Sequence, residues 1–96
     1  MIIHQREVSY SKDYKTFFDA LVKAKKHLEN RFPEISVELM YNLAGQRGRV
    51  SILTRYASLA DYERIDSEMD KDEEYVNLIQ TVIGEGLPVD QFYRVI

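Results

Sequence analysis

Cysteine is absent from this chain, and so is tryptophan. Without cysteine the protein has no disulfide, no thiolate metal ligand and no cysteine nucleophile. Histidine is scarce as well, because only His4 and His27 occur. They lie too far apart in sequence for the close ligand spacing that marks a metal site. We therefore expect neither a metal ion nor a bound cofactor.

Long hydrophobic runs are also missing. The first residues, Met1 to Arg6, hold only a short apolar stretch, which is unlike a secretory signal. No segment approaches the length of a membrane span. The net charge is -3 and the 13 basic residues are spread along the chain, which argues against a nucleic-acid surface. We expect a cytoplasmic protein with no membrane partner and no nucleic-acid partner.

The apolar residues that are present follow the spacing of four strands and two helical segments. The expected strands are 2–8, 35–43, 49–56 and 89–96, with a first helix before Pro33 and a second helical segment over 58–83. A chain of 96 residues makes a single domain, 1–96. The β-α-β-β-α-β order predicts a ferredoxin-like α+β fold, in which two helices cover one face of a four-stranded antiparallel sheet.

The first helix is strongly amphipathic. We expect its cap at Ser9 or Ser11. Phe17 and Leu21 recur on an apolar face, with Lys23 on the opposite side. Basic residues gather toward the end of this helix, where they complement the negative pole of its dipole. We interpret them as a solvated face and place His27 on the surface.

The second helical segment carries its own start and restart signals. Ser58, with an acid three residues later, predicts an N-terminal cap. An acidic run then interrupts the apolar stripe, and either Asp70 with Glu73 or Asp72 alone can cap a new turn. The segment therefore predicts one helix bent near Asp70 or two consecutive helices. A metal site is the other interpretation of the acidic run, and the capping bend is favoured over it.

The sheet face away from the helices has a mixed character that suggests a partner. It is too apolar for a plain solvent face and too polar for a dry core. We expect this face to pack against a second copy of the chain in a homodimer; a monomer with exposed apolar groups is the alternative. The residues assigned to this face are Glu38, Met40, Asn42, Ser51, Leu53, Tyr93 and Val95.

Three motifs carry a resemblance to a known family: residues 6–8 (REV), 55–62 (RYASLADY) and 69–75 (MDKDEEY). With these elements placed, the chain most resembles the NIPSNAP-like branch of the dimeric α+β barrel superfamily. The resemblance implies a homodimer whose sheets pack into a barrel, with a small-molecule cleft between helices and sheet. Relatives in the superfamily include cofactor-free quinone-forming monooxygenases. Haem-degrading relatives use a tryptophan and a histidine in the later half of the chain. This chain has no tryptophan, and its two histidines, His4 and His27, both lie in the first half.

Four residues are candidates for a site in that cleft. His4 is the catalytic candidate, because imidazole is the side chain whose ordinary pKa lies near neutrality. Tyr41 shares the helix-facing side of its strand with Val37, and Tyr62 lies on the apolar stripe of the second helical segment. We predict that Tyr41, Tyr62 and Phe17 bind a small aromatic ligand, although aromatic residues at such spacing are often core.

Three functions remain open on this sequence. The preferred one is a small-molecule-binding homodimer of NIPSNAP-like type with no assignable reaction. The second is a cofactor-independent monooxygenase or isomerase acting on an aromatic compound, and the third is a structural or regulatory dimerisation module. RNA recognition uses the same element order, but it requires stacking aromatics on the central strands. The central strands here do not supply them.

Overall fold

The computed structural model describes residues 1–9, 13–41, 48–83 and 88–96. In chain order its elements are β1 (Ile2–Ser9), α1 (Tyr14–Arg31), β2 (Ser36–Tyr41), β3 (Arg49–Tyr56), α2 (Leu59–Met69), α3 (Glu73–Ile83) and β4 (Val89–Arg94). This confirms the predicted order, with the second helical segment divided into α2 and α3. No helix within these ranges is both long and apolar enough to cross a lipid bilayer.

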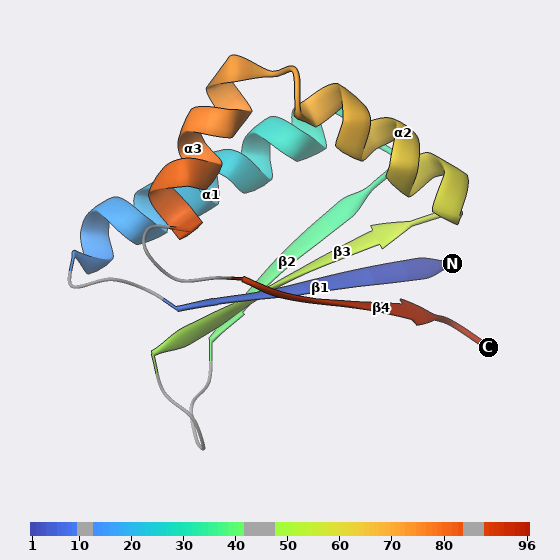
Figure 1. The fold of residues 1–96 in the computed structure, drawn as a ribbon, viewed down its shortest axis with the longest axis horizontal. Coiled ribbons are helices and arrows are strands. Elements are labelled where there is room, and N and C mark those ends of the chain that lie inside the picture. Colours follow the sequence, from blue (N-terminus) through green and yellow to red (C-terminus); the bar gives the residue numbers. More distant parts are fainter. Residues whose placement is uncertain (10–12, 42–47, 84–87) are drawn as a thin grey trace.

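The four strands form one antiparallel sheet in the order β2-β3-β1-β4. Figure 1 shows the three helices together on one side of this sheet; among the described residues, no helix covers the other side. The two chain ends are neighbours because β1 pairs with β4, with Ile2 opposite Arg94. This is the ferredoxin-like fold that the sequence predicts.

Helix α1 begins after Asp13, so the predicted cap at Ser9 or Ser11 is wrong. The Asp13 carboxylate accepts one hydrogen bond from the Thr16 amide (3.1 Å) and another from the Thr16 hydroxyl (2.7 Å). A carboxylate also supplies the negative charge that a helix N-terminus favours. Ser9 is the last residue of β1, and Ser11 lies outside the described residues.

The predicted interruption of the second helical segment is confirmed as two consecutive helices. The Ser58 hydroxyl accepts a hydrogen bond from the Asp61 amide at 3.2 Å and so caps α2. The Asp72 carboxylate accepts one from the Tyr75 amide at 3.1 Å and caps α3. The acidic run therefore ends one helix and starts the next.

Asp72 also contacts two basic side chains of α1, which corrects the prediction that His27 lies on the surface. His27 Nε2 is 2.6 Å from Asp72 Oδ2, and Arg31 Nη1 donates to the same oxygen at 2.9 Å. The His27 side chain is only 19% exposed. The hydrogen bond from His27, then that from the Tyr75 amide, hold the pKa of Asp72 far below its usual range. Asp72 thus fastens the start of α3 to α1.

Replacing Asp72 by Ala should lower the midpoint of thermal unfolding by about 4–8 °C, because the cap of α3 and the contacts of Asp72 with His27 and Arg31 are lost together. Because the pKa of Asp72 is lowered in the folded protein, its contribution to the free energy of unfolding is fully present above the pKa of an unfolded aspartate. It is lost as the pH falls through the folded value. Thermal melts at neutral and acidic pH should therefore show a difference between wild type and variant that shrinks in acid. Glu63→Ala, at an exposed position of α2, is the control. An equal loss of stability in this control would contradict the claim that Asp72 stabilises the protein by joining α3 to α1.

The two faces of the sheet follow from the strand register. Glu38 lies opposite Leu53, and Met40 lies opposite Ser51, so these four residues share the face away from the helices, as predicted. Tyr93 joins them through the pairing of β4 with β1 and of β1 with β3. Of the other residues assigned to this face, Asn42 lies outside the described residues and Val95 lies beyond the end of β4.

The core between sheet and helices is divided into two clusters. The cluster toward α2 is formed by Ile2, Leu28, Phe32, Ile35, Val37, Tyr56, Ile65 and Met69. The cluster toward the start of α1 is formed by Val8, Phe17, Ala20, Leu21, Val50 and Val82. Leu39 and Ile52, from neighbouring positions on β2 and β3, pack against both clusters but are only partly buried. The division leaves room between the clusters.

Candidate functional site

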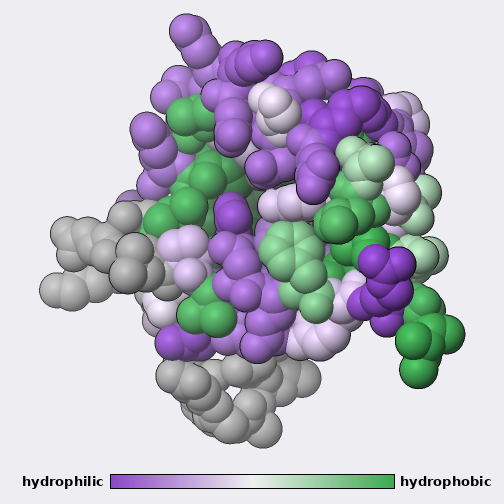
Figure 2. Space-filling view, turned by 45° about the vertical axis from the view of Figure 1, so that its right-hand side comes forward, coloured by the Kyte–Doolittle hydropathy of each residue, from purple (hydrophilic) through white to green (hydrophobic). Residues whose placement is uncertain are grey.

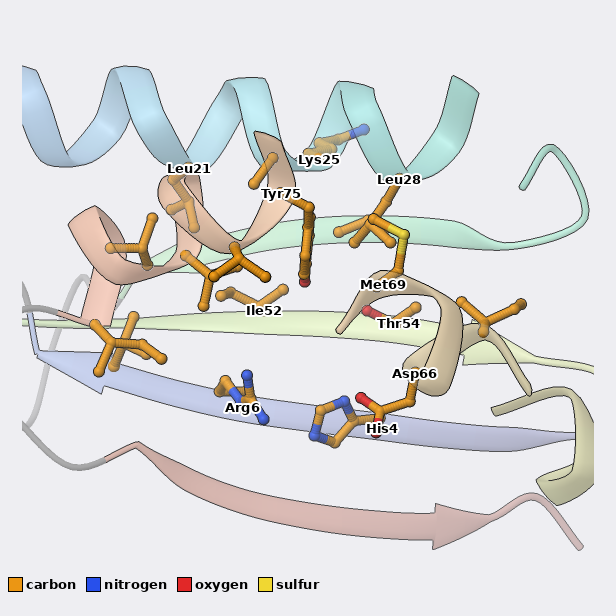
Figure 3. Close-up of a pocket in the computed structure, with 18 of the residues that line it drawn as sticks. His4, Arg6, Leu21, Lys25, Leu28, Ile52, Thr54, Asp66, Met69 and Tyr75 are labelled. Carbon is orange, nitrogen blue, oxygen red and sulfur yellow. The ribbon is translucent and has the colours of Figure 1, made fainter. Parts of the chain in front are cut away.

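A cavity of about 260 Å³ lies between the helices and the sheet, where the two core clusters meet. Its walls are mainly apolar, and Figure 3 shows Leu21 and Leu28 of α1 above Ile52 of β3. The apolar side chains that line it are Val8, Leu21, Ala24, Leu28, Val37, Leu39, Ile52, Ile65, Met69, Val76, Ile79, Val82 and Ile83. The predicted cleft between helices and sheet is therefore present as a space. A packed layer would have filled it.

Polar groups reach the cavity from five elements, because Lys25 of α1 lines it as well. His4 and Arg6 project from β1, Thr54 from β3, Asp66 from α2 and Tyr75 from α3. His4 and Arg6 lie side by side on the helix face because alternate residues of a strand point to the same side. In Figure 3 the Tyr75 ring points from α3 toward the sheet, and Asp66 approaches His4 from the helix above. Most of the cavity lining is apolar, and we call the part formed by His4, Arg6, Thr54, Asp66 and Tyr75 the polar wall.

Asp90 of β4 holds the two β1 residues in place. Its Oδ1 lies 2.8 Å from His4 Nε2 and accepts a hydrogen bond from Arg6 Nε at 2.7 Å. Arg6 Nη2 also donates to Oδ2 at 3.4 Å. Burial alone would raise the pKa of Asp90, but the hydrogen bonds from Arg6 and His4 outweigh it and lower the pKa. Asp90 is therefore an ionised acceptor under ordinary conditions.

Two other groups on the polar wall have raised pKa values. Burial raises the pKa of Tyr75 to about 12, against the opposing effect of the Arg6 cation. The Tyr75 hydroxyl therefore keeps its proton at neutral pH and can donate a hydrogen bond. Burial, and next the negative charge of Asp70, raise the pKa of Asp66, while Arg6 and His4 oppose the change.

A group of aromatic rings stands beside the polar wall. The His4 ring stacks on Phe92 with 4.6 Å between centroids, and it meets the edge of Tyr62 at 5.6 Å. Tyr62 in turn meets Tyr56 at 5.3 Å and Phe92 at 4.9 Å, both nearly at right angles. Phe92 therefore restrains the His4 ring on one face, Tyr62 restrains it through an edge contact, and Asp90 restrains it at one nitrogen. Figure 2 shows hydrophobic surface near the β4 edge, bordered by hydrophilic side chains.

The structure brings together two of the four site residues that the sequence singles out. His4 lines the cavity, and Tyr62 contacts the His4 ring without being among the lining residues. Phe17 is 2% exposed within the second core cluster, and Tyr41 is 63% exposed at the end of the edge strand β2. Neither lines the cavity. The ligand-binding roles of Tyr41, Tyr62 and Phe17 stay predictions.

Sequence reasoning missed the residues that surround His4. Arg6 and Asp90 face each other in the β1–β4 register, a signal that appears only once the two strands have been paired. Tyr75 follows the Asp72 cap by three residues, and its orientation depends on where α3 starts. Among the described residues, no group of three or more His, Asp or Glu side chains is arranged to hold a metal ion.

No protein-family model matches the chain, and no curated protein matches it in sequence. Solved structures do match the fold. An uncharacterised NIPSNAP domain protein from Burkholderia xenovorans superposes with a TM-score of 0.79 at 9% identity, over 100% of this chain and 95% of its own. A NIPSNAP family protein from Agrobacterium tumefaciens gives 0.74 at 12% identity, over 96% and 82%. A Nitrosomonas europaea protein, provisionally named an antibiotic biosynthesis monooxygenase, gives 0.76 at 15% identity, over 99% and 98%.

These similarities are in the fold, since every identity is far below the level at which sequence would indicate shared function. They confirm the fold that the resemblance to NIPSNAP-like proteins predicts, a ferredoxin-like sheet covered by helices on one side. A shared fold by itself does not assign chemistry. The function must be argued from the cavity.

Proposed function

We propose that the protein is a homodimer that binds a small, largely apolar molecule with one polar head, such as an aromatic ketone, in the cavity between helices and sheet. The observation that carries this proposal is the composition of the cavity wall. Thirteen apolar side chains surround the space, and His4, Arg6, Thr54, Asp66 and Tyr75 are among the polar residues that line it. Apolar cavities with a few convergent polar groups are the usual form of a small-molecule site.

The polar wall favours an uncharged head over a charged one. Arg6 is already paired with Asp90, so an incoming anion would compete with a carboxylate that is in place. Tyr75 offers a hydroxyl donor, and burial together with the negative charge of Asp70 raises the pKa of Asp66. A carbonyl oxygen fits such donors, because it accepts hydrogen bonds without bringing a charge that must be desolvated.

The open face of the sheet supports the homodimer. Met40 is 41% exposed there and Tyr93 is 48% exposed, while Leu53 is only partly covered. Arg55 pairs with Glu38, and Arg49 pairs with Glu7, on the same face. Exposed apolar groups between matched charges suit a two-fold contact between sheets, in which each copy meets the same surface of the other. The cytoplasm is the location that the sequence predicts, and we retain it as part of the proposal.

Filling the cavity should weaken binding without unfolding the protein. Ala24 lies on the α1 side of the cavity, so Ala24→Leu places a larger side chain into the space. Titration with 2-tetralone, a bicyclic aromatic ketone, is followed by the chemical shifts of the methyl groups. We expect the variant to bind at least about tenfold more weakly, a difference of roughly 1.4 kcal/mol. Ala60→Leu, the same change at an exposed position of α2, should bind as wild type does.

Two results would contradict the proposed function. Wild type that shows no saturable shifts with 2-tetralone would leave the structural or regulatory dimerisation module as the better interpretation. Equal binding by wild type and Ala24→Leu would place the ligand elsewhere.

A second candidate function is a cofactor-independent reaction on the bound molecule, as a monooxygenase or an isomerase. One structural neighbour is provisionally named a monooxygenase. The specific observation in this chain is His4, a restrained imidazole on the cavity wall.

A further inference from the structure

The hydrogen bond between His4 and Asp90 determines which nitrogen of the neutral ring carries the proton. A carboxylate can only accept, so His4 Nε2, at 2.8 Å from Asp90 Oδ1, must be the nitrogen that bears hydrogen. The neutral ring has one hydrogen, which leaves Nδ1 with a free lone pair. Asp90 thus selects the tautomer in which Nδ1 is the base.

The ring is also restrained in orientation. Phe92 stacks on one face, and Tyr62 meets the ring edge-on. The His4 side chain is 12% exposed and lines the cavity. Figure 3 shows the His4 ring with Asp66 beside it, on the side toward the helices. A held imidazole with a bare nitrogen, placed at an apolar cavity, has the form of a general base.

We propose that this cavity is a proton-transfer site in which His4 Nδ1 removes a proton from the carbon next to the carbonyl group of an enolisable ketone. The proposal rests on the proposed function, because the ketone must first bind in the cavity. His4 is the catalytic residue, and Asp90 is a positioning residue that acts through it.

The step is balanced without an oxidant or a cofactor. The C–H bond next to the carbonyl breaks, and its proton forms an N–H bond at His4 Nδ1. The electron pair of that bond moves into the new C=C bond of an enolate, and the negative charge settles on oxygen. Returning the proton to the same carbon gives exchange with solvent, and returning it to another carbon of the conjugated system gives an isomer.

The surrounding groups fit both charges that form in this step. The Tyr75 hydroxyl points toward the sheet and can donate to the enolate oxygen. Asp66 lies beside His4 and favours the imidazolium. The positive charge of Arg6 opposes the imidazolium, but the ion pair with Asp90 offsets that charge. The other titratable groups facing this region are Lys25 on α1, Tyr62 on α2, Asp70 at the C-terminal cap of α2 and Tyr56 on β3.

The tautomer can be measured in the protein without any ligand. In ¹⁵N spectra of the imidazole groups, we expect neutral His4 in wild type to carry its hydrogen on Nε2. Asp90→Asn introduces an amide N–H that can donate to Nε2, so the hydrogen should move partly or wholly to Nδ1. A merely structural role for Asp90 would leave the tautomer unchanged. Wild-type His4 with its hydrogen on Nδ1 would overturn the assignment of the base.

Proton transfer is measured with 2-tetralone in D₂O, as the rate at which its α-hydrogens exchange for deuterium. We expect wild type to accelerate exchange over buffer, with a rate that rises with pH and then levels off. His4→Gln should lose roughly a hundredfold or more of that acceleration. Asp90→Asn should lose part of it. The control is His27→Gln, because the other histidine contacts Asp72 rather than the cavity and should retain exchange.

Binding and exchange are measured on the same samples, so the two proposals fail in different ways. If wild type binds 2-tetralone but exchanges it no faster than buffer, the proton-transfer inference is overturned and the proposed function stands. Exchange that persists in folded His4→Gln would also overturn it, since another group would then be the base. If the ketone does not bind at all, both proposals are wrong for this class of ligand.

Discussion

Phe17→Ala should lower the free energy of unfolding by about 2–5 kcal/mol, one of the two largest stability changes we expect for a single substitution in this chain. The Phe17 ring is 2% exposed and packs in the second core cluster, where its edge meets Phe18 at 5.1 Å between centroids. Removing it loses the transfer free energy of the ring and leaves a void. The surrounding backbone of α1 and β3 can close that void only in part.

Leu21→Ala, one turn further along α1, should cost a similar amount, about 2–5 kcal/mol, because Leu21 is equally buried and already borders the cavity. Lys23→Ala is the matched control on the exposed side of the same helix and should change stability by less than roughly 0.5 kcal/mol. Urea unfolding of the three variants gives the comparison. Equal effects at all three positions would mean that the buried face of α1 has been assigned wrongly.

Leu53→Glu should convert the proposed homodimer into a monomer at concentrations where wild type is dimeric. Leu53 sits near the middle of the open face, directly opposite Glu38 in the register of β2 and β3. A new carboxylate there lies beside an existing one, and a two-fold contact presents the same pair again from the other copy. Like charges across an interface cost several kcal/mol, so the dissociation constant should rise about a hundredfold or more.

Sedimentation at micromolar concentration decides the dimer prediction. Wild type should sediment at twice the monomer mass of 11.3 kDa, and Leu53→Glu at the monomer mass. Met40→Glu, on the same face, should weaken the dimer as well. Ser67→Glu adds the same charge to the exposed side of α2 and should leave the dimer intact. A wild-type protein that sediments as a monomer would contradict the homodimer.

The sequence predicts the layers of this fold well because they depend on local periodicity. Alternation along residues 35–41 assigns Val37 and Leu39 to the helix face, and the register confirms it. The caps at Ser58 and Asp72 are likewise local, because each side chain bonds an amide three residues away. The α1 cap was missed because Asp13, Ser9 and Ser11 are all good capping residues, and sequence alone does not rank them.

The site depends on packing between elements that are distant in sequence. His4 and Asp90 meet only because β4 returns to pair with β1, and the distance of 2.8 Å follows from that pairing. His27 was placed on the surface because its neighbours on α1 are charged, yet the start of α3 brings Asp72 onto it. The cavity itself has no local signal, because the apolar residues that surround it have the same spacing as residues in a filled core.

The most direct test of this account is where a bound small molecule lies. With 2-tetralone at saturation, nuclear Overhauser effects between its protons and the protein methyl groups locate it. We predict contacts with Ile52, Met69 and Ile79, which line the cavity from β3, α2 and α3. Contacts with Met40 and Leu53, on the opposite face of the sheet, would instead contradict the central claim that the cavity is the binding site.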